Sequence, residues 1–175
     1  MNTKPRPYLY FAYGSNLHLA QMGRRCPNAI PMQRYRLAGH RLVFRGVADV
    51  VANPKKSVQG ALYAITEHCE AALDRYEGFP HLYTKKFIQD PELGTIMFYQ
   101  MTSREYIAPP TLCYFEIIME GYKNWGIKRT ALDAALPEGC DPANIQDEWV
   151  RPRPLVWDVR DTDWHSWVYG GKRKH

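Results

Sequence analysis

The sequence lacks the features that would place a protein in a membrane or in an oxidising compartment. No apolar run in its 175 residues approaches the roughly 20 residues that a membrane-spanning helix needs. Residues 1–7 are polar and contain two prolines, so they lack the apolar segment of a secretory signal peptide. We therefore expect a cytoplasmic protein without membrane partners.

The patterns of common metal and hydrolase sites are missing as well. Cys26, Cys69, Cys113 and Cys140 are far apart, and the six histidines form no H-x-x-x-H or H-E-x-x-H pair. We therefore predict reduced thiols and no metal site. The run from Gly14 to Leu17 is neither a G-x-S-x-G elbow nor part of a phosphate-binding glycine loop, which argues against a serine hydrolase and a nucleotide-binding loop.

The composition, by contrast, is that of a folded protein. Hydrophobic residues make up 45% of the chain and aromatic residues 13%, enough for one domain with a substantial core. The net charge is +5, but the last 25 residues contribute +3 of it through six basic and three acidic side chains. The main body is thus only slightly basic, and its charge does not favour a nucleic-acid partner.

The local patterns predict an α+β fold. We expect a small mixed, mostly antiparallel β-barrel flanked by helices, because several short strands are joined by turns and the helices cluster later in the chain. Gly60 lies inside a predicted strand, which indicates a close approach by another group. The expected strands are 36–44, 47–52, 58–65, 83–88 and 95–101, with a turn at 53–56, and the expected helices are 66–76, 111–123 and a short one from Thr130.

An uncharged aromatic strand near the N-terminus ends at Gly14, Ser15 and Asn16. The residues from Leu17 to Arg25 then have helical character, so Ser15 or Asn16 is a candidate N-cap. A strand that turns sharply into a helix also leaves unpaired N–H donors, which suit a carboxylate, a phosphate or an oxyanion. A capped helix and an anion site both explain this stretch.

Glu77 is the candidate acid–base residue. It lies at the C-terminal end of a predicted helix, where the helix dipole disfavours a negative charge, and its sequence neighbours include Tyr76 and Phe79. If it is buried there, its pKa rises towards neutrality, which is useful for proton transfer. The alternative is an exposed glutamate in the turn that ends the helix.

The two stretches taken together resemble the gamma-glutamylcyclotransferase superfamily. The residues that carry the resemblance are 10–17 (Y-F-A-Y-G-S-N-L) and 73–78 (L-D-R-Y-E-G). The later residues 99–102 and 108–110, with Tyr114 and Gly121, are similar to animal gamma-glutamylcyclotransferase, so the resemblance covers about residues 8–136.

The resemblance implies a small mixed barrel and an intramolecular acyl transfer. Members of the superfamily act on a small-molecule gamma-glutamyl amide or peptide and release 5-oxoproline and a free amine. No cofactor is needed, because nucleophile and electrophile lie in one molecule. By similarity Glu77 would take a proton from the substrate α-amino group and return one to the departing amine.

The same resemblance implies which residues bind the substrate. The turn would hold the glutamyl α-carboxylate or the oxyanion, and the sequence leaves both open. Tyr114 is a weaker candidate that could equally pack in the core, and His81 could orient Glu77, contact substrate or serve as an ordinary turn residue. The expected binding residues are Tyr10, Phe11, Ala12, Tyr13, Gly14, Ser15, Asn16, Leu17 and Tyr99.

Two cues point to different leaving groups. Residues 77–83 (E-G-F-P-H-L-Y) are closer to gamma-glutamylamine cyclotransferases and bacterial relatives, whereas residues 108–110 look like the glutathione-cycle enzyme. We therefore predict the class of substrate and leave the amine open.

Residues 138–175 form a predicted C-terminal extension to a domain of residues 1–137. The extension holds four of the five tryptophans, interleaved with arginine and proline. These side chains could stack on nucleic-acid bases or dock a protein, or they could cover the domain's own apolar surface or that of a second subunit in a homodimer. The chain could accordingly be a cyclotransferase of small molecules, a non-catalytic binding protein, or a cyclotransferase of gamma-glutamyl groups on macromolecules.

Overall fold

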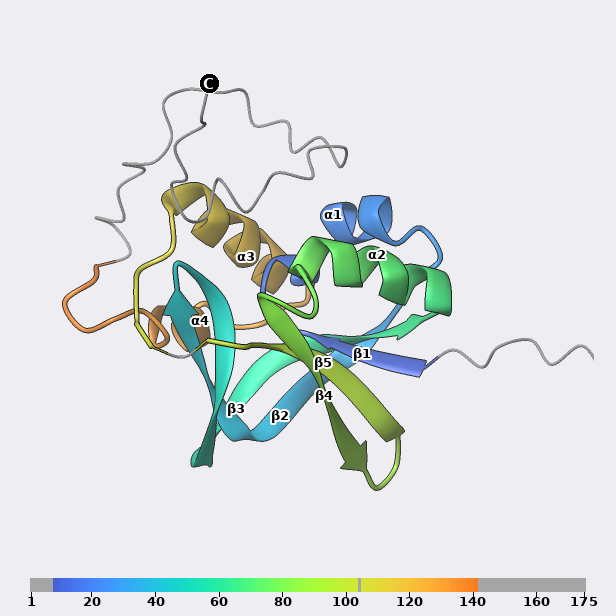
Figure 1. Ribbon diagram of the computed structural model, residues 1–175. Coiled ribbons are helices and arrows are strands. Elements are labelled where there is room, and N and C mark those ends of the chain that lie inside the picture. The colour runs from blue at the N-terminus through green and yellow to red at the C-terminus, as the bar shows by residue number, and fades with distance from the viewer. Residues whose placement is uncertain (1–7, 104, 142–175) are drawn as a thin grey trace, which may run out of the picture.

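The structure is a computed structural model that describes residues 8–103 and 105–141 (Figure 1). The predicted extension lies outside the described residues from position 142 onward. The elements in chain order are β1 (Tyr8–Ala12), the 3-10 turn η1 (Ser15–Leu17), α1 (Leu19–Arg25), β2 (Ile30–Arg45), β3 (Val47–Ile65), α2 (Glu67–Glu77), β4 (Tyr83–Asp90), β5 (Gly94–Met101), α3 (Leu112–Asn124) and α4 (Thr130–Asp133).

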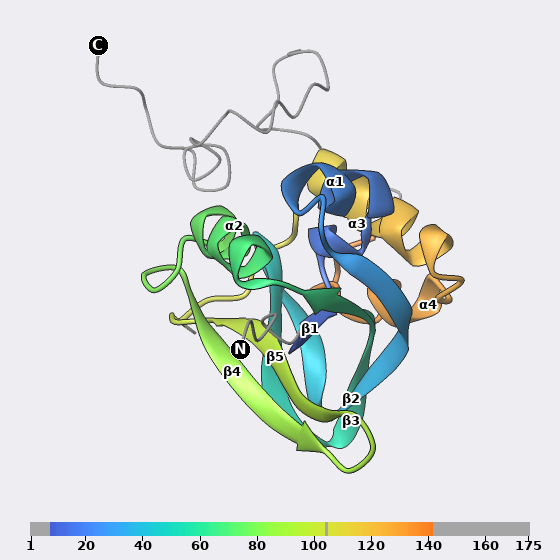
Figure 2. The same cartoon turned by 90° about the vertical axis from the view of Figure 1, so that its right-hand side faces the viewer.

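The five strands form one mixed sheet in the order β2-β3-β1-β5-β4. The central strand β1 pairs antiparallel with β3 and parallel with β5, and the remaining pairs are antiparallel. The sheet curls so that the first part of β3 meets the end of β5, where Gln100 donates to the Val50 carbonyl at 2.6 Å. Helices α1, α2 and α3 lie together beyond one end of the curled sheet (Figures 1 and 2). The predicted α+β class is confirmed.

Local capping residues set the ends of α2. The Thr66 side chain accepts from the Cys69 N–H at the start of the helix, and Gly78 takes the left-handed conformation with φ 61° at its end. A left-handed terminator requires a backbone that glycine adopts without strain. The predicted helix is therefore confirmed, and its last residue is Glu77.

The start of α1 differs from the prediction. His18 is the N-cap, its ring accepting from the Gln21 N–H, in place of the predicted Ser15 or Asn16. Those two residues belong to the 3-10 turn and are buried, and their side chains bond to α2 instead. The helix begins later because tertiary partners at α2 take the polar side chains that local capping would use.

The predicted turn at residues 53–56 is also different. Strands β2 and β3 stay paired on both sides of it, with Ala52 opposite His40 and Ser57 opposite Ala38. Residues 53–56 therefore lie opposite Gly39 as a bulge within β3. The long hairpin has enough pairing on either side to absorb turn-forming residues without ending the strand.

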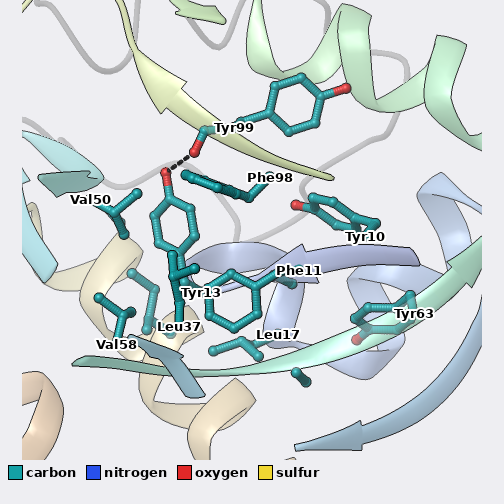
Figure 3. Packing of buried hydrophobic residues seen from close by; sticks show 14 of the residues in the cluster. Tyr10, Phe11, Tyr13, Leu17, Leu37, Val50, Val58, Tyr63, Phe98 and Tyr99 are labelled. Carbon is teal, nitrogen blue, oxygen red and sulfur yellow. Dashed lines mark hydrogen bonds between the residues drawn. The ribbon is translucent and has the colours of Figure 1, made fainter. Parts of the chain in front are cut away.

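Aromatic side chains fill the core on which β1 rests. Phe11 and Phe44 are fully buried, and Tyr63 and Tyr99 are 1% exposed. Figure 3 shows Phe11, Tyr13, Leu17 and their neighbours packed between the strands. Burying one such side chain contributes about 1.5–3 kcal/mol, so the core holds β1 and the turn that follows it in place.

Gly60 makes the close approach that the sequence predicted. A Cβ at this position would lie 2.3 Å from the Ala12 carbonyl oxygen and 2.4 Å from a ring carbon of Phe11. We expect Gly60→Ala to lower the free energy of unfolding by about 1–3 kcal/mol, because backbone and ring must move apart. Urea denaturation measures the loss.

Gly23 in α1 is the matched control for that substitution. No atom lies within 4 Å of a Cβ built there, and the residue is exposed. Gly23→Ala is expected to stabilise the protein by about 0.5–1 kcal/mol, because alanine favours a helix. Equal stability of Gly60→Ala and the unsubstituted protein would contradict the steric account.

Candidate active site

A pocket of about 280 Å³, including its open mouth, lies where the turn after β1 meets the end of α2. Strands β3, β4 and β5 and helix α3 complete its wall. The lining residues are Tyr10, Tyr13, Gly14, Ser15, Asn16, Ala48, Glu77, Tyr83, Tyr99 and Tyr114.

Glu77 is half-buried in this wall, and its carboxylate has one firm partner. The side-chain amide of Asn16 donates to Glu77 Oε1 at 2.8 Å and to the Tyr10 hydroxyl at the same distance. Asn16 and Glu77 are 61 positions apart in sequence. The structure thus joins the turn and the end of α2, the two stretches that the sequence singled out, at one point.

Burial raises the pKa of the Glu77 carboxyl to about 7. The positive charge of Arg25 and the hydrogen bond from Asn16 act in the opposite direction but are smaller. Loss of water around a carboxylate disfavours its charged form, which is the physical cause of the shift. A carboxyl group with this pKa can both accept and donate a proton near neutral pH.

The turn that faces Glu77 is clamped from outside the pocket. Tyr63 donates to the Asn16 carbonyl at 3.0 Å, and the Trp125 indole donates to the Leu17 carbonyl at 2.9 Å. The first hydrogen bond inside the turn runs from the Leu17 N–H to the Gly14 carbonyl, so the N–H groups of Ser15 and Asn16 have no acceptor within the turn. These donors lie on residues that line the pocket.

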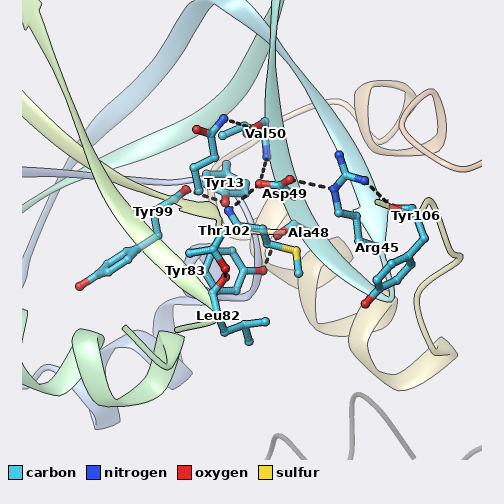
Figure 4. Close-up of polar contacts among 12 residues, drawn as sticks. Tyr13, Arg45, Ala48, Asp49, Val50, Leu82, Tyr83, Tyr99, Thr102 and Tyr106 are labelled. Carbon is cyan, nitrogen blue, oxygen red and sulfur yellow. Dashed lines mark hydrogen bonds and ion pairs between the residues drawn. The ribbon is translucent and has the colours of Figure 1, made fainter. Parts of the chain in front are cut away.

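Two of the pocket tyrosines have their hydroxyl protons committed to the backbone. Tyr13 donates to the Tyr99 carbonyl at 2.7 Å, and Tyr83 donates to the Ala48 carbonyl at 2.6 Å (Figures 3 and 4). Burial raises the pKa of both phenols well above the ordinary value of 10. The neutral Tyr13 hydroxyl therefore ties the turn to β5, and the neutral Tyr83 hydroxyl ties β4 to β3.

Two further tyrosines connect the pocket to its surroundings. The Tyr99 hydroxyl donates to Asp74 at 2.6 Å, and the other oxygen of that carboxylate pairs with Lys85 at 2.8 Å. The Tyr114 hydroxyl accepts from the Ala48 N–H at 3.2 Å, which leaves its own proton able to donate. Burial is the largest cause of the raised pKa of both phenols.

The predicted site residues divide into three groups. Tyr10, Tyr13, Gly14, Ser15, Asn16, Glu77, Tyr99 and Tyr114 line the pocket. Phe11, Ala12 and Leu17 do not line it; all three are fully buried in the core and support the turn from behind. His81 is exposed and outside the pocket wall, and its carbonyl accepts from the Thr102 hydroxyl.

Ala48 and Tyr83 also line the pocket, although neither was among the predicted site residues. Ala48 lies on β3, and a Cβ on Gly14 would approach its side chain to 3.2 Å. Tyr83 begins β4 and follows the Glu77–Gly78 turn, and this proximity along the chain was the signal available. Ala48 carries no such signal, because an alanine in a strand has no chemistry of its own.

Within residues 8–103 and 105–141, no group of three or more histidine, cysteine, aspartate or glutamate side chains is arranged to hold a metal ion. Of the helices in the same described ranges, none has the length and apolar character needed to cross a membrane.

Comparison with known sequences identifies the family to which the chain is similar. A sequence profile of the family described as "Gamma-glutamyl cyclotransferase, AIG2-like" matches residues 10–113. The chain is 30% identical over 137 residues to gamma-glutamylcyclotransferase of Homo sapiens and 28% identical to that of Bos taurus. Each alignment covers 69% of this chain and 72% of the relative.

Solved structures agree with this placement. A structure from Homo sapiens described as "uncharacterized protein loc79017" has a TM-score of 0.66 and 28% identity, and covers 78% of this chain and 92% of that one. One described as "Gamma-glutamyl cyclotransferase" has a TM-score of 0.68 at 23% identity, covering 94% and 99%, and shows the shared fold. Because the family profile spans more than half of the chain, this protein belongs to the gamma-glutamyl cyclotransferase, AIG2-like family, a family of enzymes.

Proposed function

We propose that the protein converts a small gamma-glutamyl amide or peptide into 5-oxoproline and a free amine, with Glu77 as the residue that moves the protons. The observation that carries this proposal is the position of Glu77, whose carboxyl has a pKa of about 7 in the wall of a pocket that faces the Gly14–Asn16 turn. Membership of the family supports the reaction class.

The reaction begins with proton removal. A substrate α-amino group with a pKa of about 8 is mostly ammonium near neutral pH and cannot attack in that form. The Glu77 carboxylate accepts a proton from it, and the resulting amine attacks the γ-carbonyl carbon and closes the five-membered ring. Holding both groups in one folded molecule makes this attack favourable, and no cofactor takes part.

The reaction ends when the tetrahedral intermediate collapses. The Glu77 carboxylic acid gives its proton to the departing nitrogen as the C–N bond of the amide breaks. The carboxylate so formed takes the second proton from the α-nitrogen and passes it to the freed amine. Two protons have then left the α-nitrogen and two have reached the leaving amine, so the carboxyl group returns to its starting state. One carboxyl group with a pKa near neutrality suffices for both directions of transfer.

The turn supplies the donors for the negative charges of the substrate. The N–H groups of Ser15 and Asn16 can bind the α-carboxylate or the oxyanion, and the neutral Tyr114 hydroxyl can donate to the other. The phenols stay protonated because burial raises their pKa, so they do not repel an anionic substrate. A pocket with hydrogen-bond donors and neutral phenols suits an acyl-transfer intermediate with one developing negative charge.

The direct test is release of 5-oxoproline from gamma-glutamyl amino acids and gamma-glutamyl-ε-lysine. We expect turnover of at least one of these compounds. An N-acetylated gamma-glutamyl compound is the matched control and should give no product, because its nitrogen cannot attack. Absence of product from the whole panel, or product from the N-acetylated compound, would contradict the proposal.

The pH dependence of kcat/KM is expected to report Glu77. The folded-state pKa of about 7 lies above the ordinary value of 4.5, so the carboxylate needed for the first step disappears as the pH falls through 7. We therefore expect an acid limb with its midpoint at about pH 7, the same for different gamma-glutamyl substrates. A midpoint near pH 4.5 would show that Glu77 titrates as an ordinary exposed carboxylate.

A further inference from the structure

We propose that Arg25, in the last turn of α1, is a positioning residue that sets the orientation of the Asn16 amide and, through it, of the Glu77 carboxylate. This inference rests on the proposed function of Glu77. Arg25 belongs to no sequence feature that suggested a catalytic role. The inference is drawn from the contacts that Arg25 makes in the folded chain.

The guanidinium of Arg25 is held by two contacts, one with an aromatic ring and one with the Asn16 amide. It lies over the ring of Tyr76, 3.3 Å from the ring centroid, and Nη1 donates to Asn16 Oδ1. A cation stacked on an aromatic face is held in a defined plane. Tyr76 is itself held by a 2.9 Å hydrogen bond to the Ser15 hydroxyl, so α1, α2 and the turn meet at this contact.

The orientation of the Asn16 amide follows from that contact. A guanidinium has donors and no acceptor, so the atom that faces Arg25 must be the amide oxygen. The NH₂ group is then directed to the other side, where its two hydrogens go to Glu77 Oε1 and the Tyr10 hydroxyl. With the amide reversed, Oδ1 would face the Glu77 carboxylate and repel its charge.

The consequence at Glu77 is that one carboxylate oxygen is anchored. Oε1 is held by Asn16, which leaves Oε2 for the substrate proton. Tyr10 accepts from the same amide, so its own hydroxyl proton is available to donate into the pocket. Arg25 thus determines that Glu77 presents Oε2 and that Tyr10 presents its hydroxyl proton to the pocket, although Arg25 does not line the pocket itself.

The positive charge of Arg25 also acts on the pKa of the Glu77 carboxyl. In the described part of the chain, Arg25 is the charged side chain that acts on the Glu77 carboxyl, and its effect lowers the pKa. Burial keeps the neighbouring phenols neutral. The titratable groups that interact electrostatically with Glu77 are Tyr10, Tyr13, Arg25, Tyr83, Tyr99 and Tyr114; β3 contributes Ala48, which does not titrate, to the same wall.

The test compares Arg25→Gln, Arg25→Lys and Arg24→Gln with the unsubstituted protein. Arg24 is exposed on the same helix turn and is the matched control for loss of one positive charge. Carbon-13 NMR of labelled glutamate carboxyls follows the titration of Glu77, assigned by the signal missing in Glu77→Gln. The acid limb of kcat/KM is measured in parallel, and thermal melting confirms that each variant is folded.

We expect the Glu77 pKa in Arg25→Gln to rise by about one unit, which is the effect of losing a nearby opposite charge and a well-oriented donor. At pH 7 this alone reduces kcat/KM roughly fivefold, and the loss should shrink as the pH is raised. Arg25→Lys keeps a charge and a donor and should recover most of the activity. Arg24→Gln should match the unsubstituted protein in both measurements.

Two outcomes would overturn the inference. One is a folded Arg25→Gln whose Glu77 signal and acid limb stay in place, and the other is an equal shift in Arg24→Gln. If Arg25→Gln does not fold, Arg25→Lys decides. An Arg25→Lys variant that melts like the unsubstituted protein, but whose acid limb of kcat/KM is displaced from that of the unsubstituted protein, would argue against positioning. Absence of 5-oxoproline from the unsubstituted protein would refute the proposed function instead, and the NMR titration would still decide the effect of Arg25 on Glu77.

Discussion

Replacing Glu77 by glutamine is expected to reduce 5-oxoproline release roughly 100- to 10,000-fold, the range for loss of a general acid–base group. Glutamine keeps the shape of the side chain and can still accept from the Asn16 amide that now bonds Oε1 at 2.8 Å. It cannot take a proton from the substrate ammonium. Turnover under saturating substrate measures the loss, because proton transfer belongs to the chemical step.

The stability of this variant separates chemistry from folding. The folded-state pKa of Glu77 is raised, so its contribution to stability is present below the unfolded value of 4.5 and is lost as the pH rises through about 7. Removing the charge should therefore leave the melting temperature at pH 8 unchanged or higher. Glu67→Gln, an exposed position in the first turn of the same helix, is the matched control and should keep full activity. Retained turnover in a folded Glu77→Gln would refute the mechanism.

Replacing Asp49 by alanine is expected to lower the free energy of unfolding by about 3–5 kcal/mol, the typical cost of removing one member of a buried ion pair. Asp49 is fully buried and accepts from Arg45 Nε at 3.0 Å. It also accepts from the backbone N–H groups of Val50 and Met101, at 2.8 and 2.9 Å (Figure 4). The carboxylate therefore joins the β2–β3 hairpin to the end of β5, and chemical denaturation measures what the junction contributes.

The chain contains a matched exposed pair for comparison. Arg129 Nε lies 3.1 Å from Asp133, with the same chemistry and the same spacing of four residues, but both side chains are solvent-accessible. Asp133→Ala should cost no more than about 1 kcal/mol, because water already screens the pair. Equal losses for the two substitutions would mean that burial does not determine the contribution of Asp49.

The Asp49 junction also affects the pocket. The adjacent Ala48 accepts from Tyr83 and donates to Tyr114, so loosening this part of β3 releases two lining tyrosines. We expect the residual folded fraction of Asp49→Ala to have a raised KM for gamma-glutamyl substrates. The position of the Glu77 acid limb should stay near pH 7, because Asp49 is not among the groups that shift that carboxyl.

The elements with short-range signals were predictable from the sequence. The helix between Thr66 and Gly78 has a cap, an apolar stripe and a left-handed terminator within a dozen residues, and its predicted bounds hold to within one residue. The hairpin formed by β4 and β5 carries its turn between two β-rich runs, and it too is where the sequence indicated. In both, the interactions that decide the structure join residues close together in the chain.

The two halves of the candidate site were also visible before the fold was known. The Gly14–Asn16 turn and Glu77 each have a local chemical signature, and their resemblance to one superfamily connected them. The burial of Glu77 was conditional at that stage, since an exposed glutamate fitted the same local pattern. The pocket wall that desolvates it comes from β3, β4, β5 and α3, so its pKa depends on contacts between elements distant in sequence.

Side chains with more than one available partner are where local reasoning was insufficient. Ser15 and Asn16 could have capped α1, but Tyr76 and Glu77 on α2 take their side chains, and His18 becomes the cap. The local sequence therefore determines the turn, the helix that ends at Glu77 and the class of chemistry they suit. The orientation of the Asn16 amide depends on three-dimensional packing, because only the folded chain brings Arg25 against the amide oxygen. In our proposal the orientation of the Glu77 carboxylate follows from that of the amide.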